Sequence, residues 1–340
     1  MAQAMRRFAL IAVLCLTLAP AASAQPKGSW AAREIRIVTA RGLMGGDATK
    51  FRPDAPLTQG ALAALAAGLT GKQAATATTP SAPATMAQLD ASLVTALGLR
   101  ADAADFAAAA RAAGLAPPSR FGTEVVARLL GLRTNHPAGQ DPLELLPNDP
   151  ATRAEAAFSA AGVLGLGDWE LQSLADDATT FALPDLTPWQ RRVLGVAVSF
   201  IGYPYIWGGT SENAQTPLGV STPGGFDCSG LVWRVYKLQA YPGAPQLAGV
   251  IRGRTTMQMS GEVPKSKRIG IDHLQPADVL FFGSRGKKSS PAQVDHAAIY
   301  LGDGWLIQSS GEGVALAKLD GWYASSFAWA RRPLAEAHLS

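Results

Sequence analysis

The stretch Gly224-Gly225-Phe226-Asp227-Cys228-Ser229-Gly230-Leu231-Val232 places one cysteine between a glycine turn and a predicted helix. Apolar side chains recur at helical spacing from Leu231 to Leu238, which predicts a helix over these residues. Cys228 therefore lies at a helix start, where unpaired backbone N–H groups and the macrodipole favour an anion over a neutral thiol. Such a thiol is expected to ionise near neutral pH and to act as a nucleophile. The alternative is a buried structural cysteine, the commoner role of a single cysteine.

The first residues of the chain have the pattern of a secretion signal, which we assign to residues 1–24. Arg6 and Arg7 form the positive region, 8–18 the apolar core, and Ala22-Ser23-Ala24 the cleavage site. The apolar core is too short to span a bilayer, and no later segment reaches transmembrane length, so we expect a secreted envelope protein without stable membrane insertion. Cys15 lies in the apolar core after Leu14, which leaves a lipoprotein as a weaker alternative.

Removal of this signal leaves Cys228 as the single cysteine of the mature chain. Secreted proteins ordinarily pair their cysteines, so an unpaired one indicates an intermolecular bridge or a functional thiol. The formal charge falls from +4 to +2 with the loss of Arg6 and Arg7. This surplus gives no reason to expect a nucleic-acid partner and is compatible with an anionic cell wall. The 340 residues, 48% apolar and 16% charged, suffice for two folded domains.

Residues 25–185 are predicted to form a small helical domain. One strand is expected at Glu34–Val38, where polar and apolar residues alternate. Helices are expected over 60–69, 89–99, 102–115, 121–132 and 152–164, with glycines 98, 114 and 131 at helix ends and a Thr/Ala/Pro-rich loop over 74–85. Thr152 and Glu155 have the spacing of a capping box.

Two similar segments in this region, Pro56-Leu57-Thr58 and Pro150-Ala151-Thr152, each precede an alanine-rich helix and suggest a degenerate repeat of helical hairpins. The stretch Leu145–Ala157, with its Thr-Arg-Ala-Glu, resembles the S-layer homology module, which in bacteria binds polymers attached to the cell wall. The copy with Gln59-Gly60-Ala61 is less similar, and Phe121-Gly122-Thr123-Glu124 is less similar still. The alternative is a set of helices capped by ordinary Thr and Asp residues.

Residues 186–340 are predicted to form an α+β domain with an antiparallel sheet. A helix is expected to begin with Thr187 as its N-cap and Pro188 as its first residue. Gln190 completes a capping box with Thr187. Strands are expected near 279–282, over 294–301 and over 305–308, the last two joined by a hairpin at Gly302-Asp303-Gly304. The polar segment 210–223 is interpreted as an excursion at the rim of the site, and the basic segment 251–267 as solvated surface.

A thiol nucleophile needs a base, and imidazole titrates in the right range. Of the four histidines, at 136, 273, 296 and 338, only His296 opens a predicted strand, which would hold its ring. The hairpin brings Gln308 alongside, and its amide oxygen could fix the tautomer of the imidazole. Asp295 would point to the opposite face of the strand. A structural role for His296 remains the alternative.

Four blocks in one order resemble the NlpC/P60 family of papain-like cysteine peptidases: Gly202–Gly209, Phe226–Gly230, Leu274–Phe282 and His296–Gly302. The resemblance implies hydrolysis of peptidoglycan stem peptides, commonly between D-γ-glutamyl and a diamino acid. It implies Cys228 as nucleophile, His296 as base and Gln308 as third residue, a position that is most often His in the family. It also implies that Tyr205, Trp207, Asp227 and Ser229 bind substrate.

Two other functions stay open. One is a wall-binding protein whose catalytic half is weak or inactive, and the other is an amidase or transpeptidase on the same scaffold. The sequence shows neither a metal-ligand cluster nor a phosphate-binding glycine loop, so no metal or cofactor is expected. The expected partners are peptidoglycan stem peptides and, through the helical domain, a secondary cell-wall polymer.

Overall fold

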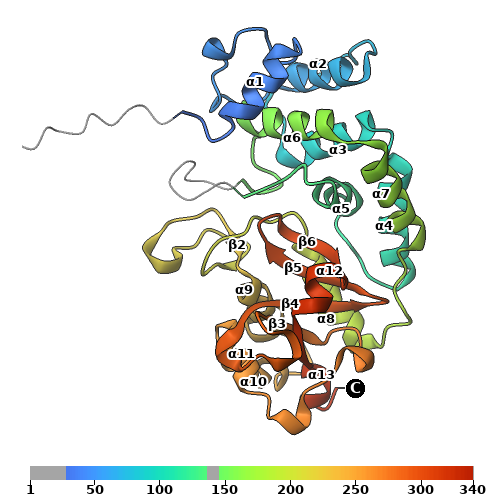
Figure 1. Ribbon diagram of the computed structural model, residues 1–340, viewed down its shortest axis with the longest axis vertical. Coiled ribbons are helices and arrows are strands. Elements are labelled where there is room, and N and C mark those ends of the chain that lie inside the picture. Colours follow the sequence, from blue (N-terminus) through green and yellow to red (C-terminus); the bar gives the residue numbers. More distant parts are fainter. Residues whose placement is uncertain (1–27, 136–144, 340) are drawn as a thin grey trace, which may run out of the picture.

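The computed structural model describes residues 28–135 and 145–339, so the predicted signal sequence and His136 lie outside the described residues. A helical region lies above an α+β region in Figure 1. The helical region contains α1 (Ala32–Ala40), α2 (Gln59–Thr70), α3 (Met86–Ala96), α4 (Arg100–Ala112), α5 (Phe121–Leu129), α6 (Arg153–Gly165) and α7 (Asp168–Thr180). Within the described ranges, no helix combines the length and the apolar character needed to cross a membrane.

The strand predicted at Glu34–Val38 is wrong, because these residues lie in helix α1. Ile35 and Val38 are buried three positions apart on the helix face that packs against α6, while Ile37 is exposed. The alternating pattern over five residues fits either structure, and packing against α6 selects the helix. The helices expected over 60–69, 89–99, 102–115 and 121–132 are confirmed, with Gly98, Gly114 and Gly131 at positive φ just past their ends. Helix α7 was not predicted.

The repeat in the helical region has three copies, and the third is not the one expected at Phe121. Three Pro-x-Thr segments, Pro56-Leu57-Thr58, Pro83-Ala84-Thr85 and Pro150-Ala151-Thr152, pair with one another. Their backbones close a ring in which Leu57 N–H donates to Ala151 O (2.7 Å), Ala151 N–H to Ala84 O (2.8 Å) and Ala84 N–H to Leu57 O (2.8 Å). Each threonine then caps a helix through its Oγ1, those of α2, α3 and α6. A pseudo-threefold arrangement of helices follows from this ring.

The capping box expected at Thr152 is only half formed. Thr152 Oγ1 accepts from the Glu155 N–H at 3.2 Å, as predicted. The Glu155 carboxylate instead accepts from Arg133 Nη1 at 3.1 Å, and Arg133 Nε lies 3.6 Å from Asp90. All three side chains are buried, so charge pairing inside the helical region takes the carboxylate away from the helix cap.

The predicted α+β class with an antiparallel sheet is confirmed. The sheet has the order β6-β5-β4-β3-β7, and every neighbouring pair is antiparallel. Its strands are β3 (Val279–Gly283), β4 (Val294–Gly302), β5 (Trp305–Ser310), β6 (Gly313–Lys318) and β7 (Phe327–Arg331), of which β6 and β7 were not predicted. Around it lie β1 (Thr210–Ser211), β2 (Gly225–Phe226), α8 (Pro188–Ser199), α9 (Cys228–Trp233), α10 (Leu247–Val250), α11 (Thr256–Gly261), α12 (Gly321–Ser326) and α13 (Pro333–Glu336).

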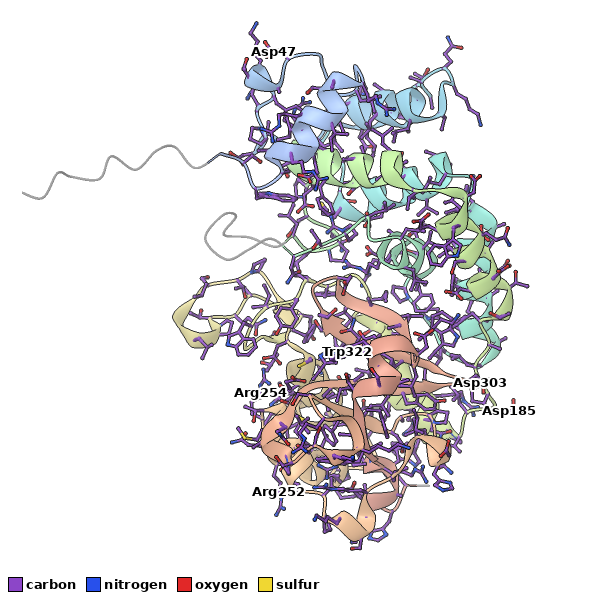
Figure 2. All side chains as sticks on the ribbon, in the orientation of Figure 1. Asp47, Asp185, Arg252, Arg254, Asp303 and Trp322 are labelled. Atoms are coloured by element: carbon purple, nitrogen blue, oxygen red, sulfur yellow. The ribbon has the colours of Figure 1, made fainter. Side chains whose placement is uncertain are left out.

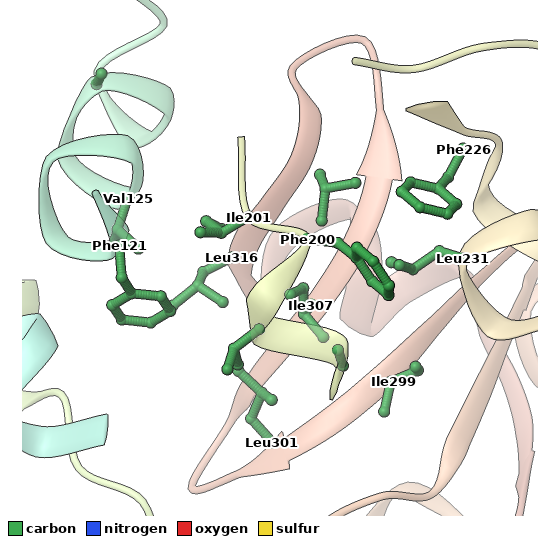
Figure 3. Packing of buried hydrophobic residues seen from close by; sticks show 14 of the residues in the cluster. Phe121, Val125, Phe200, Ile201, Phe226, Leu231, Ile299, Leu301, Ile307 and Leu316 are labelled. Atoms are coloured by element: carbon green, nitrogen blue, oxygen red, sulfur yellow. The ribbon is translucent and has the colours of Figure 1, made fainter. Parts of the chain in front are cut away.

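The two faces of the sheet are covered differently. One face joins a core that continues into the helical region, and Figure 3 shows Phe121 and Val125 of α5 beside Leu316 of β6. Leu231 of α9 and Ile299 of β4 belong to the same core. The opposite face carries a smaller cluster of Leu280, Phe282, Ala298, Leu306, Phe327 and Ala330. Because one core crosses between the two regions, helix α5 is held directly against the sheet.

Candidate active site

Cys228 is the first residue of helix α9, three residues before the predicted helix start. Asp227 caps this helix, because its Oδ1 accepts a hydrogen bond from the Gly230 N–H. Its Oδ2 accepts a second hydrogen bond from the Gly208 N–H at 2.9 Å, which ties the helix start to the preceding turn. Gly230 packs so closely on Gly209 that a Cβ would lie 1.8 Å from the Gly209 carbonyl oxygen. The glycine after Ser229 is therefore required for the helix start to sit against the Gly208-Gly209 turn. After α9 the chain continues as one π-helical turn over Arg234–Leu238.

Arg254 is part of the site, and its interpretation as solvated surface is wrong. Its Nη1 and Nη2 lie 3.1 and 3.0 Å from the two carboxylate oxygens of Asp227, a bidentate pair. It also donates to Ser229 Oγ at 2.7 Å and to Gly209 O at 3.2 Å. Arg254 lies just before α11 and is labelled in Figure 2. A sequence signal existed: a carboxylate next to the nucleophile and inside the fold calls for a cationic partner.

Cys228 opens into a cavity of about 300 Å³. The residues that line it are Trp207, Gly208, Leu218, Asp227, Cys228, Ser229, Arg254, Thr255, Thr256 and Asp295. Trp207 and Leu218 are 71% and 75% exposed, so they form an apolar rim, and Leu218 belongs to the excursion that was expected there. Three of the four predicted substrate-binding residues, Trp207, Asp227 and Ser229, thus line this cavity, whereas Tyr205 and His296 do not.

His296 and Gln308 lie on one face of the sheet. Ala298 of β4 is paired with Gln308 of β5, and His296 stands two residues from Ala298 on the same face. Within the described ranges, His296 Nε2 and Gln308 Oε1 are buried without a hydrogen-bond partner, while Gln308 Nε2 donates to Ser310 Oγ at 3.0 Å. The imidazole lies among Phe282, Trp322 and Tyr323, with ring centroids 5.7 to 6.0 Å away. Trp322 is exposed on α12 (Figure 2).

The thiol lies against the backbone on both sides of His296. Cys228 Sγ is 3.9 Å from the carbonyl oxygen of Asp295, and the backbone N–H of Ala297 also interacts with it. Because His296 Nε2 has no hydrogen-bond partner, that nitrogen does not receive the thiol proton in this structure. Asp295 is exposed and lines the cavity, away from the face that carries Gln308. The structure therefore brings Cys228 to the strand position of the predicted base.

The expectation of a thiolate near neutral pH is wrong. Burial and, to a smaller extent, the negative charge of Asp227 raise the pKa of the Cys228 thiol to about 11. The N–H groups of Ala297 and Ser229 and the charge of Arg254 act in the opposite direction but more weakly. Burial also lowers the pKa of His296 to about 4. At neutral pH the site therefore holds a neutral thiol and a neutral imidazole.

The NlpC/P60 family profile matches residues 202–332, a span that contains all four sequence blocks and the site described above. Residues 202–332 are an NlpC/P60 domain. This confirms the family that the sequence resembles. The S-layer homology domain profile matches residues 24–63, which confirms the second resemblance. That match contains Pro56-Leu57-Thr58, the copy with the less similar sequence, and not the Leu145–Ala157 copy.

Curated relatives share the NlpC/P60 domain with this chain. A protein of Mycobacterium bovis named "Probable endopeptidase" is 34% identical over 136 residues, 39% of this chain and 27% of that protein. A γ-D-glutamyl-L-lysine dipeptidyl-peptidase of Bacillus cereus is 34% identical over 126 residues, 36% of this chain and 29% of the relative. The chain thus spans less than a third of these relatives. A solved NlpC/P60 family protein from Bacillus cereus is 29% identical over 45% of this chain and 42% of its own, with a TM-score of 0.33.

The thiol of the NlpC/P60 domain is expected to react slowly with iodoacetamide at pH 7. With a pKa near 11, the thiolate fraction is roughly 100-fold or more below that of an unperturbed cysteine. The alkylation rate should rise about tenfold per pH unit from pH 7 to 10. Mass spectrometry of the Cys228 peptide measures this rate, with free cysteine in the same buffer as control. A plateau of the rate between pH 6 and 7 would instead demonstrate a thiolate.

The protein is expected to lose stability as the pH falls from 6.5 to 4. In this range an unfolded chain protonates His296 at its usual pKa, whereas the folded protein holds the ring neutral down to about pH 4. The unfolded state then binds more protons, so the free energy of unfolding decreases with falling pH, by at most about 3 kcal/mol from this group. Denaturant unfolding of wild type and His296→Phe at pH 7 and pH 5 measures the effect. An equal acid loss in both proteins would contradict it.

Proposed function

We propose that the NlpC/P60 domain hydrolyses an amide bond of peptidoglycan stem peptides, with Cys228 as nucleophile, His296 as base and Gln308 as orienting residue. The observation that carries this proposal is the position of Cys228. Its thiol opens into a cavity of about 300 Å³ and packs on the strand backbone at both sides of His296. Ser229 also lines the cavity, but its hydroxyl is committed to Arg254 and Asp227. The thiol is therefore the nucleophile that this cavity offers to a substrate.

Because thiol and imidazole are both neutral, the proton moves during the attack and not before it. The sulfur forms a bond to the carbonyl carbon of the substrate while His296 takes the thiol proton. The imidazolium then gives this proton to the leaving amine, and an acyl-thioester on Cys228 remains. Water, deprotonated by His296, releases the acid and restores the thiol. Backbone N–H groups near Sγ, those of Ser229 and Ala297, would stabilise the negative charge on the oxygen of the intermediate.

Gln308 supports this role for His296 through two complementary atoms. Among the described residues, Gln308 Oε1 and His296 Nε2 have no hydrogen-bond partner and do not bond each other, so a bond from Nε2–H to Oε1 would require the two side chains to turn toward each other. This bond would leave Nδ1 without a proton and thus able to act as the base. An amide carries no charge, so it orients the imidazolium without the electrostatic stabilisation that a carboxylate would add. We therefore assign Gln308 an orienting role.

The proposed bond has a D-γ-glutamyl group on its acyl side. When glutamate is linked through its γ-carboxyl group, its α-carboxylate stays free and negatively charged. Arg254 lines the cavity beside Cys228, and a substrate carboxylate would share its guanidinium with Asp227. The relative named γ-D-glutamyl-L-lysine dipeptidyl-peptidase agrees with this assignment. We propose the bond between D-γ-glutamate and the diamino acid as the one cleaved.

The helical region would attach the enzyme to its substrate. We propose that residues 25–185 bind a wall polymer, that the catalytic domain begins at 186, and that residues 1–24 direct the chain to the cell envelope. The S-layer homology match at 24–63 supports the first of these assignments. One alternative has an observation in its favour. The burial of Cys228 and His296, which keeps both neutral, suits a wall-binding protein with weak activity.

Digestion of purified peptidoglycan with the full-length chain tests the proposal. Mass spectrometry of the soluble products should show fragments that end in D-γ-glutamate and others with a free amine on the diamino acid. A sample without protein serves as control. Fragments from a different bond would overturn the assigned specificity. Binding to peptidoglycan without any released fragment would establish the wall-binding alternative.

A further inference from the structure

Side chains of the helical region donate a row of hydrogen bonds to several carbonyl groups along one backbone segment, which leads from the end of α8 into the NlpC/P60 domain. Arg120 donates to Ser199 O at 2.9 Å and to Ile201 O at 3.1 Å. Arg128, buried with Glu124, donates to Gly202 O at 2.7 Å. Asn135 continues this row to Tyr205 at the edge of the active site. The row thus follows the chain from the end of α8 to a residue predicted to bind substrate.

Asn135 satisfies both backbone groups of Tyr205. Its Nδ2 donates to Tyr205 O at 2.6 Å, and its Oδ1 accepts from the Tyr205 N–H at 3.2 Å. Its own N–H donates to Gly311 O at 2.7 Å, in the turn that follows β5. Ser310, the last residue of β5, accepts the hydrogen bond from Gln308. One asparagine of the helical region therefore connects the two sides of the catalytic domain that carry Tyr205 and Gln308.

The segment at Tyr205 is held between Asn135 on one side and the strand before Cys228 on the other. Ile206 N–H donates to Phe226 O, and Phe226 N–H donates to Pro204 O, both at 3.1 Å. Phe226 is followed directly by Asp227 and Cys228. The charges of these two groups raise the pKa of the Tyr205 phenol, after the larger effect of burial, so the phenol lies within electrostatic range of the thiol. A shift of the Tyr205 backbone would change the distance between phenol and thiol.

Asn135 is itself fixed by the charged centre of the helical region. Arg133, two residues earlier, pairs with Asp90 of α3 and Glu155 of α6. These carboxylates belong to the two helices that follow the second and third Pro-x-Thr segments. The asparagine therefore extends from the packed core of the helical region and not from a free linker.

We propose that Asn135 is a positioning residue of the peptidase, which holds Tyr205 at its working distance from Cys228. The helical region is then part of the active-site architecture as well as an attachment module. This inference rests on the proposed function, because it assigns a purpose to the position of Tyr205. It predicts that Asn135 acts on catalysis through Tyr205 and not through the overall stability of the protein.

A double-mutant cycle in the full-length chain tests this coupling. Asn135→Ala should lower kcat/KM for stem-peptide release by roughly tenfold or more, since a small misplacement of a substrate-positioning group has effects of this size. In a Tyr205→Ala background, Asn135→Ala should change kcat/KM by less than twofold, because the phenol that Asn135 positions is absent. Thr134→Ala is the matched control, since among the described residues its hydroxyl donates only to the Asn135 carbonyl, at 3.5 Å, and it should leave the rate unchanged. Equal losses in both backgrounds, or no loss from Asn135→Ala, would overturn the proposal.

Amide hydrogen exchange gives a second readout that does not need activity. The Tyr205 amide should exchange about tenfold faster in Asn135→Ala than in wild type, the factor expected for one lost hydrogen bond. Amides of α3 should keep their wild-type rates. If wild-type protein releases no fragments, the proposed function fails and the exchange result alone decides whether Asn135 holds Tyr205. Unchanged exchange at Tyr205 would overturn the positioning role whatever the activity.

Discussion

Cys228→Ala should abolish the release of stem-peptide fragments, with a fall in kcat on the order of 10⁶. The loss should be complete because the neighbouring hydroxyl in the cavity, that of Ser229, donates to Asp227 and accepts from Arg254. Cys228→Ser should be equally inactive, since a hydroxyl is a far weaker nucleophile and its proton is harder to remove. The measurement is chromatography of peptidoglycan digests at matched protein concentrations.

The Cys228 variants also separate chemistry from binding. Alanine and serine are small enough to fit the buried position, so the unfolding midpoint and the sedimentation with intact peptidoglycan should stay near wild type. Retention of more than about one hundredth of the wild-type rate by Cys228→Ala would show that the nucleophile lies elsewhere. Residual activity of Cys228→Ser alone would not show this, because serine keeps an oxygen nucleophile at the same position.

His296→Phe should lower the rate by about 10³ to 10⁴ at pH 7, near the upper end for loss of a general acid–base group. The high pKa of Cys228 is the reason, because a neutral thiol depends on a base more than a thiolate does. Phenylalanine keeps the aromatic packing with Phe282, Trp322 and Tyr323, so the fold should remain.

The pH dependence of the His296 variant identifies the reason for its loss. As the pH rises toward 10 the thiol ionises without help, so the ratio of wild-type to variant rates should narrow. It should not reach one, because the variant cannot protonate the leaving amine. Initial rates on soluble stem peptides from pH 6 to 10 measure the ratio. A ratio that is constant over this range would assign His296 a structural role.

The residues proposed as catalytic could be selected from the sequence because each lies in a short block with its own local signal. Cys228 has the glycine turn and the helix start, and His296 and Gln308 are connected by one hairpin, so strand pairing alone brings them to the same face. Arg254 was missed because its partner Asp227 is 27 residues away, and the helical pattern of 231–238 between them does not extend to Arg254. Contacts of this kind depend on the tertiary fold, which periodicity does not contain.

The direction of the pKa shift of Cys228 was predicted wrongly for a related reason. A helix start is visible in the sequence, and it does favour the thiolate. The burial of the sulfur is set by packing. Together with the charge of Asp227, it raises the pKa of the thiol by more than the helix start lowers it. The third repeat was missed likewise, because Pro83-Ala84-Thr85 lies in a stretch whose composition suggests a loop and only its pairing with two distant segments reveals its role.

The ring of the three Pro-x-Thr segments limits how this chain can be shortened. Each segment gives one backbone donor to a neighbour and receives one from the other. Excision of any one copy would leave one backbone N–H and one backbone carbonyl without a hydrogen-bond partner. The two remaining copies could not replace these bonds with the same geometry. The three segments are therefore one indivisible unit, and a minimal version of the protein must keep all three of them or none.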